Sequence, residues 1–174
     1  GCSVNGIIVG IPVPHRIGRR LSLLDVPGKN DLPPYHVTVA YFGKMSEVED
    51  RTRRELISTV YDVCRRHPPM VLKMGGFGVF TPSGTSEGKS PLIYTVDTPG
   101  LAELRTDLTR ALKSILPVKQ DHGFVPHVTV GYLPEGKSLS HVRVPDVRYP
   151  DWTIHSVEVI FGDIPVEIQL GGED

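Results

Sequence analysis

Short apolar runs separated by turn-forming residues predict a chain that contains both strands and helices. Apolar runs rich in β-branched and aromatic residues are typical of strands, and the glycines and prolines between them mark turns. The predicted strands lie at residues 6–13, 36–42, 70–80, 91–97, 127–133, 153–161 and 164–170. Gly75-Gly76 predicts an irregularity within the third strand. Gly162-Asp163 has the residue types of a tight hairpin turn between the last two strands.

Two longer segments repeat their apolar residues with the period of a helix. The first has Ser46 and Glu49 at the spacing of a capping box, which predicts that a helix opens there and runs to about Arg66. The second begins at Thr98-Pro99, with proline at the first helical position, and ends before Pro117. A short helix is also possible in the basic stretch after the first strand.

A heptapeptide occurs twice and divides the chain into two similar halves. His-Val-Thr-Val-Ala-Tyr-Phe at 36–42 and His-Val-Thr-Val-Gly-Tyr-Leu at 127–133 match at five of seven positions, 91 residues apart. Each copy lies on a predicted strand, in a half with one well-defined helix. We therefore predict a duplication, with two α+β lobes related by a rough two-fold axis that set His36 and His127 facing each other.

Strand alternation predicts which side chains accompany the two histidines. Residues i and i+2 point to the same side of a strand. The predicted shared face holds His36, Thr38, Ala40 and Phe42 on one strand and His127, Thr129, Gly131 and Leu133 on the other. The small Ala40 and Gly131 leave room for a ligand. Tyr41 and Tyr132 fall with the valines on the opposite face, as packing residues.

A histidine beside a threonine suits a phosphate group. Imidazole exchanges protons near neutral pH, and a hydroxyl can donate a hydrogen bond to a phosphate oxygen. Two such pairs supply both halves of acid–base catalysis: one neutral histidine takes a proton from the attacking hydroxyl or water, and the other, as imidazolium, protonates the leaving oxygen. The threonines would stabilise the charge that builds up on the phosphate. This chemistry requires no metal and no cofactor.

Paired His-x-Thr motifs on strands, in a chain of this length, resemble the 2H phosphoesterase superfamily. That group includes bacterial 2′-5′ RNA ligase-like proteins, tRNA-splicing cyclic phosphodiesterases and viral enzymes that destroy nucleotide messengers. The resemblance implies one bilobal α+β domain over residues 1–174, with two antiparallel sheets and flanking helices around a central cleft. It also implies catalytic roles for His36, Thr38, His127 and Thr129. Members act on 2′,3′-cyclic phosphates, 2′-5′ linkages or cyclic oligonucleotides.

Two other functions use the same residues. A duplicated binding module could hold a nucleotide without cleaving it, although simple binding would not need a matched acid and base. An RNA 2′-5′ ligase could run the hydrolytic reaction in reverse. A zinc site formed by Asp121, His122 and His127 is a third possibility, but these residues lack the dense ligand spacing of such sites.

Four residues outside the motifs are candidate substrate contacts. Phe124 and Phe42 could stack on a base, with core packing as the alternative for Phe42. Lys119 is either a phosphate contact or plain solvent-exposed surface. Arg16 opens the basic cluster 16–20, which either reaches a phosphate or forms a solvated face.

Composition and charge favour a small substrate. The chain has 19 basic and 20 acidic residues and a net charge of −1. A protein that grips long nucleic acid usually has a basic excess, so a small nucleotide or short oligonucleotide is the expected partner. Two cysteines, Cys2 and Cys64, suggest no disulfide framework, and no apolar run approaches the ~20 residues that span a bilayer. We expect a monomer in the cytoplasm of a cell or of an infected host.

Overall fold

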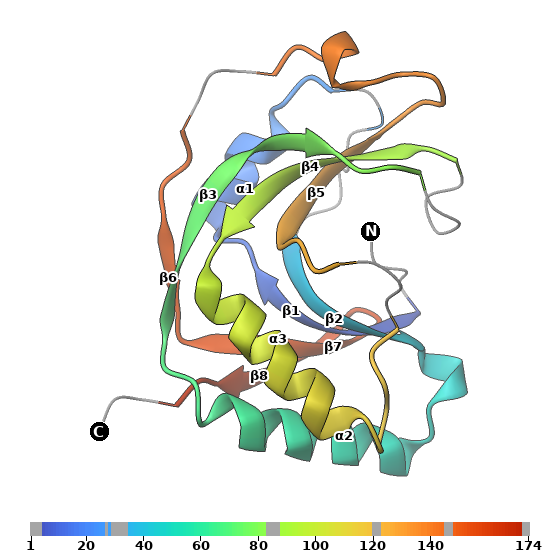
Figure 1. Ribbon diagram of the computed structural model, residues 1–174, viewed down its shortest axis with the longest axis vertical. Helices are drawn as coiled ribbons and strands as arrows, with labels where there is room; N and C mark the ends of the chain where they lie inside the picture. The colour runs from blue at the N-terminus through green and yellow to red at the C-terminus, as the bar shows by residue number, and fades with distance from the viewer. Residues whose placement is uncertain are drawn as a thin grey trace.

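The part of the chain that the structure describes folds into one curled antiparallel sheet with three α-helices packed on it (Figure 1). The computed structural model describes residues 5–26, 28, 35–82, 88–119, 123–144 and 148–171. The strands are β1 (Gly6–Pro12), β2 (His36–Lys44), β3 (Met70–Val79), β4 (Ser90–Asp97), β5 (His127–Leu133), β6 (Trp152–Ile154), β7 (Ser156–Phe161) and β8 (Ile164–Gln169). The helices are α1 (His15–Ser22), α2 (Asp50–Cys64) and α3 (Pro99–Leu112), with 3₁₀ turns η1 (Met45–Glu47) and η3 (Leu139–His141).

The eight strands form a single sheet, which differs from the expected pair of sheets. Their order is β6-β3-β4-β5-β2-β1-β7-β8. The two motif strands, β2 and β5, are the central neighbours, and one bridge between Val37 and Val128 joins them. Because that bridge continues the ladder from one repeat into the other, the two halves of this α+β fold share one sheet.

The two repeats exchange strands across this centre. In the first half of the sheet β2 and β1 are followed by β7, and in the second half β5 and β4 are followed by β3. β3 therefore lies beside strands of the second repeat, and β7 beside strands of the first. The predicted strand 153–161 is broken at His155, since β6 pairs with β3 and β7 with β1. The chain passes from one half of the curled sheet to the other at this break (Figure 1).

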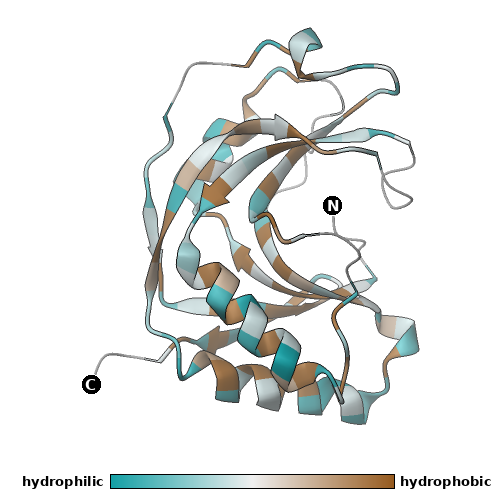
Figure 2. Cartoon of the chain, in the orientation of Figure 1, coloured by the Kyte–Doolittle hydropathy of each residue, from teal (hydrophilic) through white to brown (hydrophobic). Residues whose placement is uncertain are grey.

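The helices bury the faces that the sequence predicts. Leu56, Val60 and Val63 of α2 are fully or almost fully buried, and four leucines of α3 are completely buried. Hydrophobic and hydrophilic residues accordingly alternate in colour around both helices in Figure 2. Among the described residues, no helix combines the length and the apolar character needed to cross a membrane.

The predicted capping box at Ser46 is wrong. α2 begins at Asp50, Glu49 takes the cap position without a side-chain hydrogen bond, and Ser46 lies within η1. The guanidinium of Arg53 donates to the backbone carbonyls of Met45 and Val48. These bonds stabilise the 3₁₀ turn before the helix, which competes with an earlier helix start.

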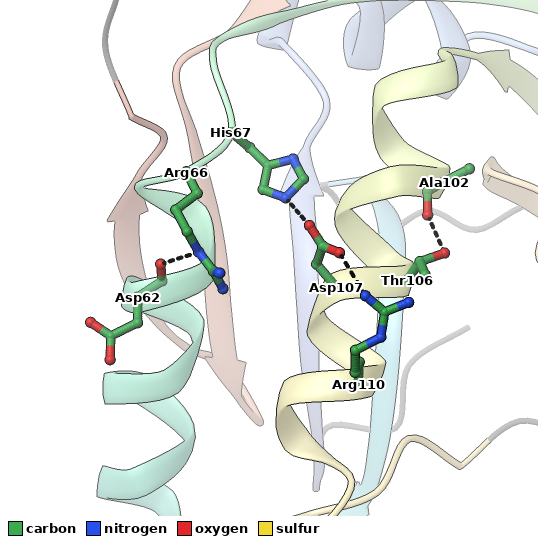
Figure 3. Close-up of polar contacts among 7 residues, drawn as sticks. All are labelled: Asp62, Arg66, His67, Ala102, Thr106, Asp107 and Arg110. Carbon is green, nitrogen blue, oxygen red and sulfur yellow. Dashed lines mark hydrogen bonds and ion pairs between the residues drawn. The ribbon is translucent and has the colours of Figure 1, made fainter.

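A side-chain hydrogen bond joins the end of α2 to α3. The imidazole Nε2 of His67 lies 2.7 Å from the carboxylate of Asp107, and Arg110 approaches the other carboxylate oxygen (Figure 3). His67 is buried, so its polar ring needs such a partner. We interpret this histidine as a structural residue.

Candidate active site

The bridge between β2 and β5 brings the two His-x-Thr pairs together. Val37 and Val128 are the bridged residues, and a histidine and a threonine flank each of them. In an antiparallel ladder, neighbours of a bridged pair oppose one another in reverse order, so Thr38 faces His127 and His36 faces Thr129. The valines are completely buried, whereas the four polar residues are half-buried on the other face of the sheet. Each histidine is thus next to the threonine of the other repeat.

A β-bulge follows the threonine in both strands. The partners of β1 skip from Ala40 to Thr38, which leaves Val39 as an extra residue in β2. The partners of β4 skip from Gly131 to Thr129, which leaves Val130 as the extra residue in β5. These are the same position of the repeated motif. Bulges bend a strand and redirect its side chains, so the repeat encodes local geometry as well as chemistry.

Arg105 of α3 stabilises the first of these bulges. A bulged residue loses its regular ladder partner. The guanidinium of Arg105 donates to the backbone carbonyl of Val39 at 2.5 Å. The Cζ atom of the same guanidinium lies 4.8 Å from the centroid of the Phe124 ring. Burial lowers the pKa of Arg105, which identifies it as a partly desolvated cation.

The bulges correct the predicted orientation of the two matched tyrosines. One extra residue reverses the alternation, so Tyr41 returns to the face of Thr38. Tyr41 pairs with Ile8, and Thr38 pairs with Gly10. Ile8 and Gly10 lie on the same face of β1, because the Ile8 Cδ1 atom is 3.1 Å from the position of a Cβ built on Gly10. The same reversal in β5 puts Tyr132 on the face of Thr129. Both tyrosines are half-buried rather than core residues.

The same reversal moves Phe42 and Leu133 into the core. Phe42 is 1% exposed and belongs to the hydrophobic cluster, as does Leu133. In this structure the Phe42 ring is therefore not available to stack on a base. The aromatic residues that lie on the same face as the motif threonines are Tyr41 and Tyr132. Only the identity of these tyrosines in both repeats could have indicated their role from the sequence.

His127 is oriented by a backbone carbonyl and an aromatic ring. Its Nδ1 lies 2.7 Å from the carbonyl oxygen of Val125. A carbonyl only accepts hydrogen bonds, so Nδ1 carries a proton and the neutral ring presents an unprotonated Nε2. The ring of Phe80, just after β3, meets the imidazole edge to face, with centroids 4.7 Å apart. Sequence reasoning did not identify Phe80, whose position is set by long-range strand pairing.

His36 faces a carboxylate instead. Its Nε2 lies 3.8 Å from Oε1 of Glu158 on β7, and the two side chains are 22% and 20% exposed. Burial, and secondarily the neighbouring Glu167, raise the pKa of Glu158 above its ordinary value. An acidic residue between the buried Val157 and Val159 is the sequence signal that could have identified it.

The loop that precedes each motif crosses the other motif strand. The backbone N–H of Lys119 donates to the carbonyl of Tyr41, and the N–H of Tyr132 donates to the carbonyl of Gly28. Gly28 has a φ of +59°, and a Cβ there would lie 2.0 Å from the Tyr132 carbonyl oxygen. Only glycine fits this contact. The two crossings are 91 residues apart, as are the motifs, so the two-fold relation extends to the loops.

The structure places the other three predicted substrate contacts, Lys119, Phe124 and Arg16, in different surroundings. The ammonium of Lys119 pairs with Glu47 at 3.2 Å and its side chain lies over Gly43. Gly43 is seven residues along β2 from His36, about 20 Å at the rise of a strand. Phe124 packs on Arg105. Arg16 is exposed on α1, four residues after Pro12, which pairs with His36.

The residues considered for zinc binding are only partly described. Asp121 and His122 lie outside the described residues. Within the described ranges, no group of three or more His, Cys, Asp and Glu side chains is arranged to hold a metal ion.

The neighbouring strands β2 and β5 carry the two His-x-Thr pairs for which the sequence resembles the 2H phosphoesterases. The sequence profile of the 2′-5′ RNA ligase superfamily matches residues 18–160, which is most of the chain. The protein belongs to this superfamily. No curated protein sequence matches the chain.

Solved structures with low sequence identity share the fold. The TT0787 protein of Thermus thermophilus superposes with a TM-score of 0.72 at 18% identity, covering 97% of this chain and 100% of its own. LigT of E. coli, solved with 3′-AMP, gives a TM-score of 0.64 at 15% identity over 89% of this chain and 87% of its own. Usb1 of Kluyveromyces marxianus, solved with uridine monophosphate, gives 0.62 at 12% identity over 97% and 100%.

Proposed function

We propose that this protein is a metal-independent phosphodiesterase that hydrolyses a small nucleotide or short oligonucleotide by two-histidine acid–base catalysis. One observation carries the proposal: the Val37–Val128 bridge sets a His-x-Thr pair from each repeat side by side on one face of the sheet. Catalytic roles for His36, Thr38, His127 and Thr129 follow from this placement. A binding module would not need an imidazole in each of two matched positions.

The arrangement supplies the groups that phosphodiester hydrolysis needs. One imidazole accepts a proton from water through Nε2 while the water oxygen bonds to phosphorus. The other imidazole, as imidazolium, gives its proton to the leaving oxygen as the P–O bond breaks. The hydroxyls of Thr38 and Thr129 donate hydrogen bonds to the non-bridging phosphate oxygens, where negative charge accumulates. Arg16 remains a candidate for a further phosphate contact, given its position beyond Pro12.

Three linkages are the candidate substrates: a 2′,3′-cyclic phosphate, a 2′-5′ linkage as in oligoadenylate, and the linkage of a cyclic oligonucleotide messenger. Nucleotides are bound in the LigT and Usb1 structures, which supports a nucleotide substrate here. The net charge of −1 offers no general attraction for a long polyanion, so a short substrate is favoured.

The test is turnover of a nucleotide panel in EDTA by the wild type and by His36→Ala and His127→Ala. The panel holds 2′,3′-cyclic mononucleotides, 2′-5′ oligoadenylate, and cyclic di- and trinucleotides. We expect cleavage of one class by the wild type and a loss of about 10²–10⁴-fold in each folded variant. Asp107→Asn, which changes the contact with His67 between α2 and α3 and none of the four motif residues, is the control for effects on folding. Cleavage that stops in EDTA would contradict the metal-independent mechanism, and tight binding without cleavage would favour the binding module.

RNA ligation is the second candidate, because the matching superfamily is described as 2′-5′ RNA ligases. The same histidines could catalyse attack of a 5′-hydroxyl on a 2′,3′-cyclic phosphate. Incubation of RNA fragments with these two ends distinguishes the reactions, since ligation lengthens the RNA and hydrolysis only opens the cyclic phosphate.

A further inference from the structure

The two halves of the candidate active site differ at one pair of equivalent positions. The strand order places β7 beside β1 in one half and β3 beside β4 in the other. Paired residues on neighbouring strands form a row across each half, starting at the motif threonine. In one half the row is Thr38 on β2, Gly10 on β1 and Glu158 on β7. In the other half it is Thr129 on β5, Ile93 on β4 and Gly78 on β3. Glu158 therefore corresponds to Gly78. At this position one half carries a carboxylate and the other has no side chain.

Gly10 allows the carboxylate to reach the histidine. Glu158 lies two strands away from β2, about 10 Å at the usual spacing of strands. Gly10, between them, places no side chain over the sheet, and His36 Nε2 comes within 3.8 Å of Glu158 Oε1. In the other half Ile93 takes the position of Gly10 and is almost completely buried.

His127 has neighbours of a different kind. Phe80 presents its ring to the imidazole and the carbonyl of Val125 holds Nδ1. An aromatic ring gives an imidazolium far less stabilisation than a nearby carboxylate does. The duplicated motif is chemically identical in both halves, but the electrostatic surroundings of its two histidines are not.

We propose that Glu158 is a positioning residue that keeps His36 protonated in the resting protein, so that His36 is the general acid and His127 the general base. This inference rests on the proposed phosphodiesterase function. In the reaction His127 Nε2 takes a proton from the attacking water, whose oxygen bonds to phosphorus. The P–O bond to the leaving oxygen breaks, and that oxygen receives the proton of His36. Exchange with solvent then restores both rings.

The charged groups around Glu158 define its pH range. His36 faces it from β2, Glu167 is its paired residue on β8, and Gly10 contributes no charge from β1. Burial and Glu167 raise the pKa of Glu158. As the pH falls, Glu158 therefore loses its negative charge at a higher pH than an exposed glutamate does. Below that pH Glu158 is neutral and no longer favours the protonated imidazole.

The first test uses the protein without substrate. The imidazole C–H signals of His36 and His127, assigned with His36→Gln and His127→Gln, are followed by NMR against pH in the wild type, Glu158→Gln and Glu167→Gln. We expect His36 to hold its proton to higher pH than His127, and to lose it about one pH unit lower in Glu158→Gln. Glu167→Gln, which removes a carboxylate that does not contact His36, should not lower this midpoint. Equal titration of the two histidines, or no effect of Glu158→Gln, would overturn the proposal.

The second test removes the need for an acid. A p-nitrophenyl ester of the nucleotide that the panel identifies has a leaving group that departs without protonation. On this ester His36→Ala should stay within about tenfold of the wild type, whereas His127→Ala should lose about 10²–10⁴-fold, as both do on the natural linkage. The reverse pattern would overturn the assignment. If no nucleotide is cleaved, the proposed function fails and the acid role with it, while the NMR titration still decides whether Glu158 controls the charge of His36.

Discussion

Replacing Arg105 with methionine tests whether α3 stabilises the bulge in the first motif strand. Arg105→Met keeps an unbranched aliphatic side chain but removes the guanidinium, which donates to the Val39 carbonyl and packs on the Phe124 ring. A hydrogen bond from a charged donor contributes about 1.5–3 kcal/mol to the free energy of unfolding. For a domain of this size each kcal/mol corresponds to about 2–4 °C in Tm, so Tm should fall by about 3–12 °C.

Arg110→Met is the matched control on the same helix. Its side chain is 77% exposed and pairs with Asp107 at 3.8 Å, an interaction that surface screening makes weak. We expect a change within about 0.5 kcal/mol, or less than about 2 °C. Thermal unfolding followed by circular dichroism measures both variants. If Arg105→Met unfolded within about 1 °C of Arg110→Met, the guanidinium would not stabilise the bulge.

Activity provides a second measurement on the same variants. The bulge sets the direction of Thr38 and Tyr41, and a misplacement of about 1 Å at a catalytic group can cost about 10²-fold. At a temperature at which both variants are folded, kcat should fall in Arg105→Met and stay unchanged in Arg110→Met. A large Tm loss without a change in kcat would mean that the guanidinium stabilises the strand without setting the geometry of the site.

Three further predictions concern single side chains. Because the folded protein raises the pKa of Glu158 above its ordinary 4.5, this carboxyl contributes stability below 4.5 that is lost as pH rises through the raised pKa. Glu158→Gln should therefore raise Tm at pH 9, where an imidazole is neutral and offers no positive charge to offset the burial of the carboxylate, and leave Tm unchanged below pH 4.5. The opposite order would contradict the burial effect. Burial raises the pKa of Cys64 to about 12, so in a Cys2→Ser variant iodoacetamide at pH 8 should add no mass until the protein unfolds. Phe42→Ala should cost about 3–5 kcal/mol, or about 6–20 °C in Tm, whereas a small loss would place the ring outside the core.

The sequence predicts those elements whose signals are local. The motif strand 127–133 has the predicted bounds, α3 begins at Pro99 with Thr98 at its cap, and the last two strands turn at Gly162-Asp163. In each case the residue types that favour the structure lie within the element itself. The predicted irregularity at Gly75-Gly76 is confirmed by a register shift in β3, where the Thr95 hydroxyl bonds to the backbone of Gly76.

The features that the sequence did not predict depend on partners far along the chain. The bulges at Val39 and Val130 exist only relative to β1 and β4, so alternation within the motif assigned the tyrosines to the wrong face. The break at His155 reflects pairing to two different strands, a long-range property that the residue types of 153–161 do not specify. Glu158 reaches His36 through strand order and through Gly10, neither of which is visible from either residue alone.

The pairing of β1 with β7 has a consequence for how the protein is made. Ile7 lies beside Phe161, so β1 obtains its second neighbour only after the strands and helices between them in the sequence have been synthesised. Until then an apolar edge of β1 remains open, which favours slow folding and leaves the nascent chain prone to aggregation. Glu158 arrives on that same late strand. Both motifs would therefore be synthesised before the side chain that supplies a carboxylate to His36, and an incomplete chain would lack this difference between the two imidazoles.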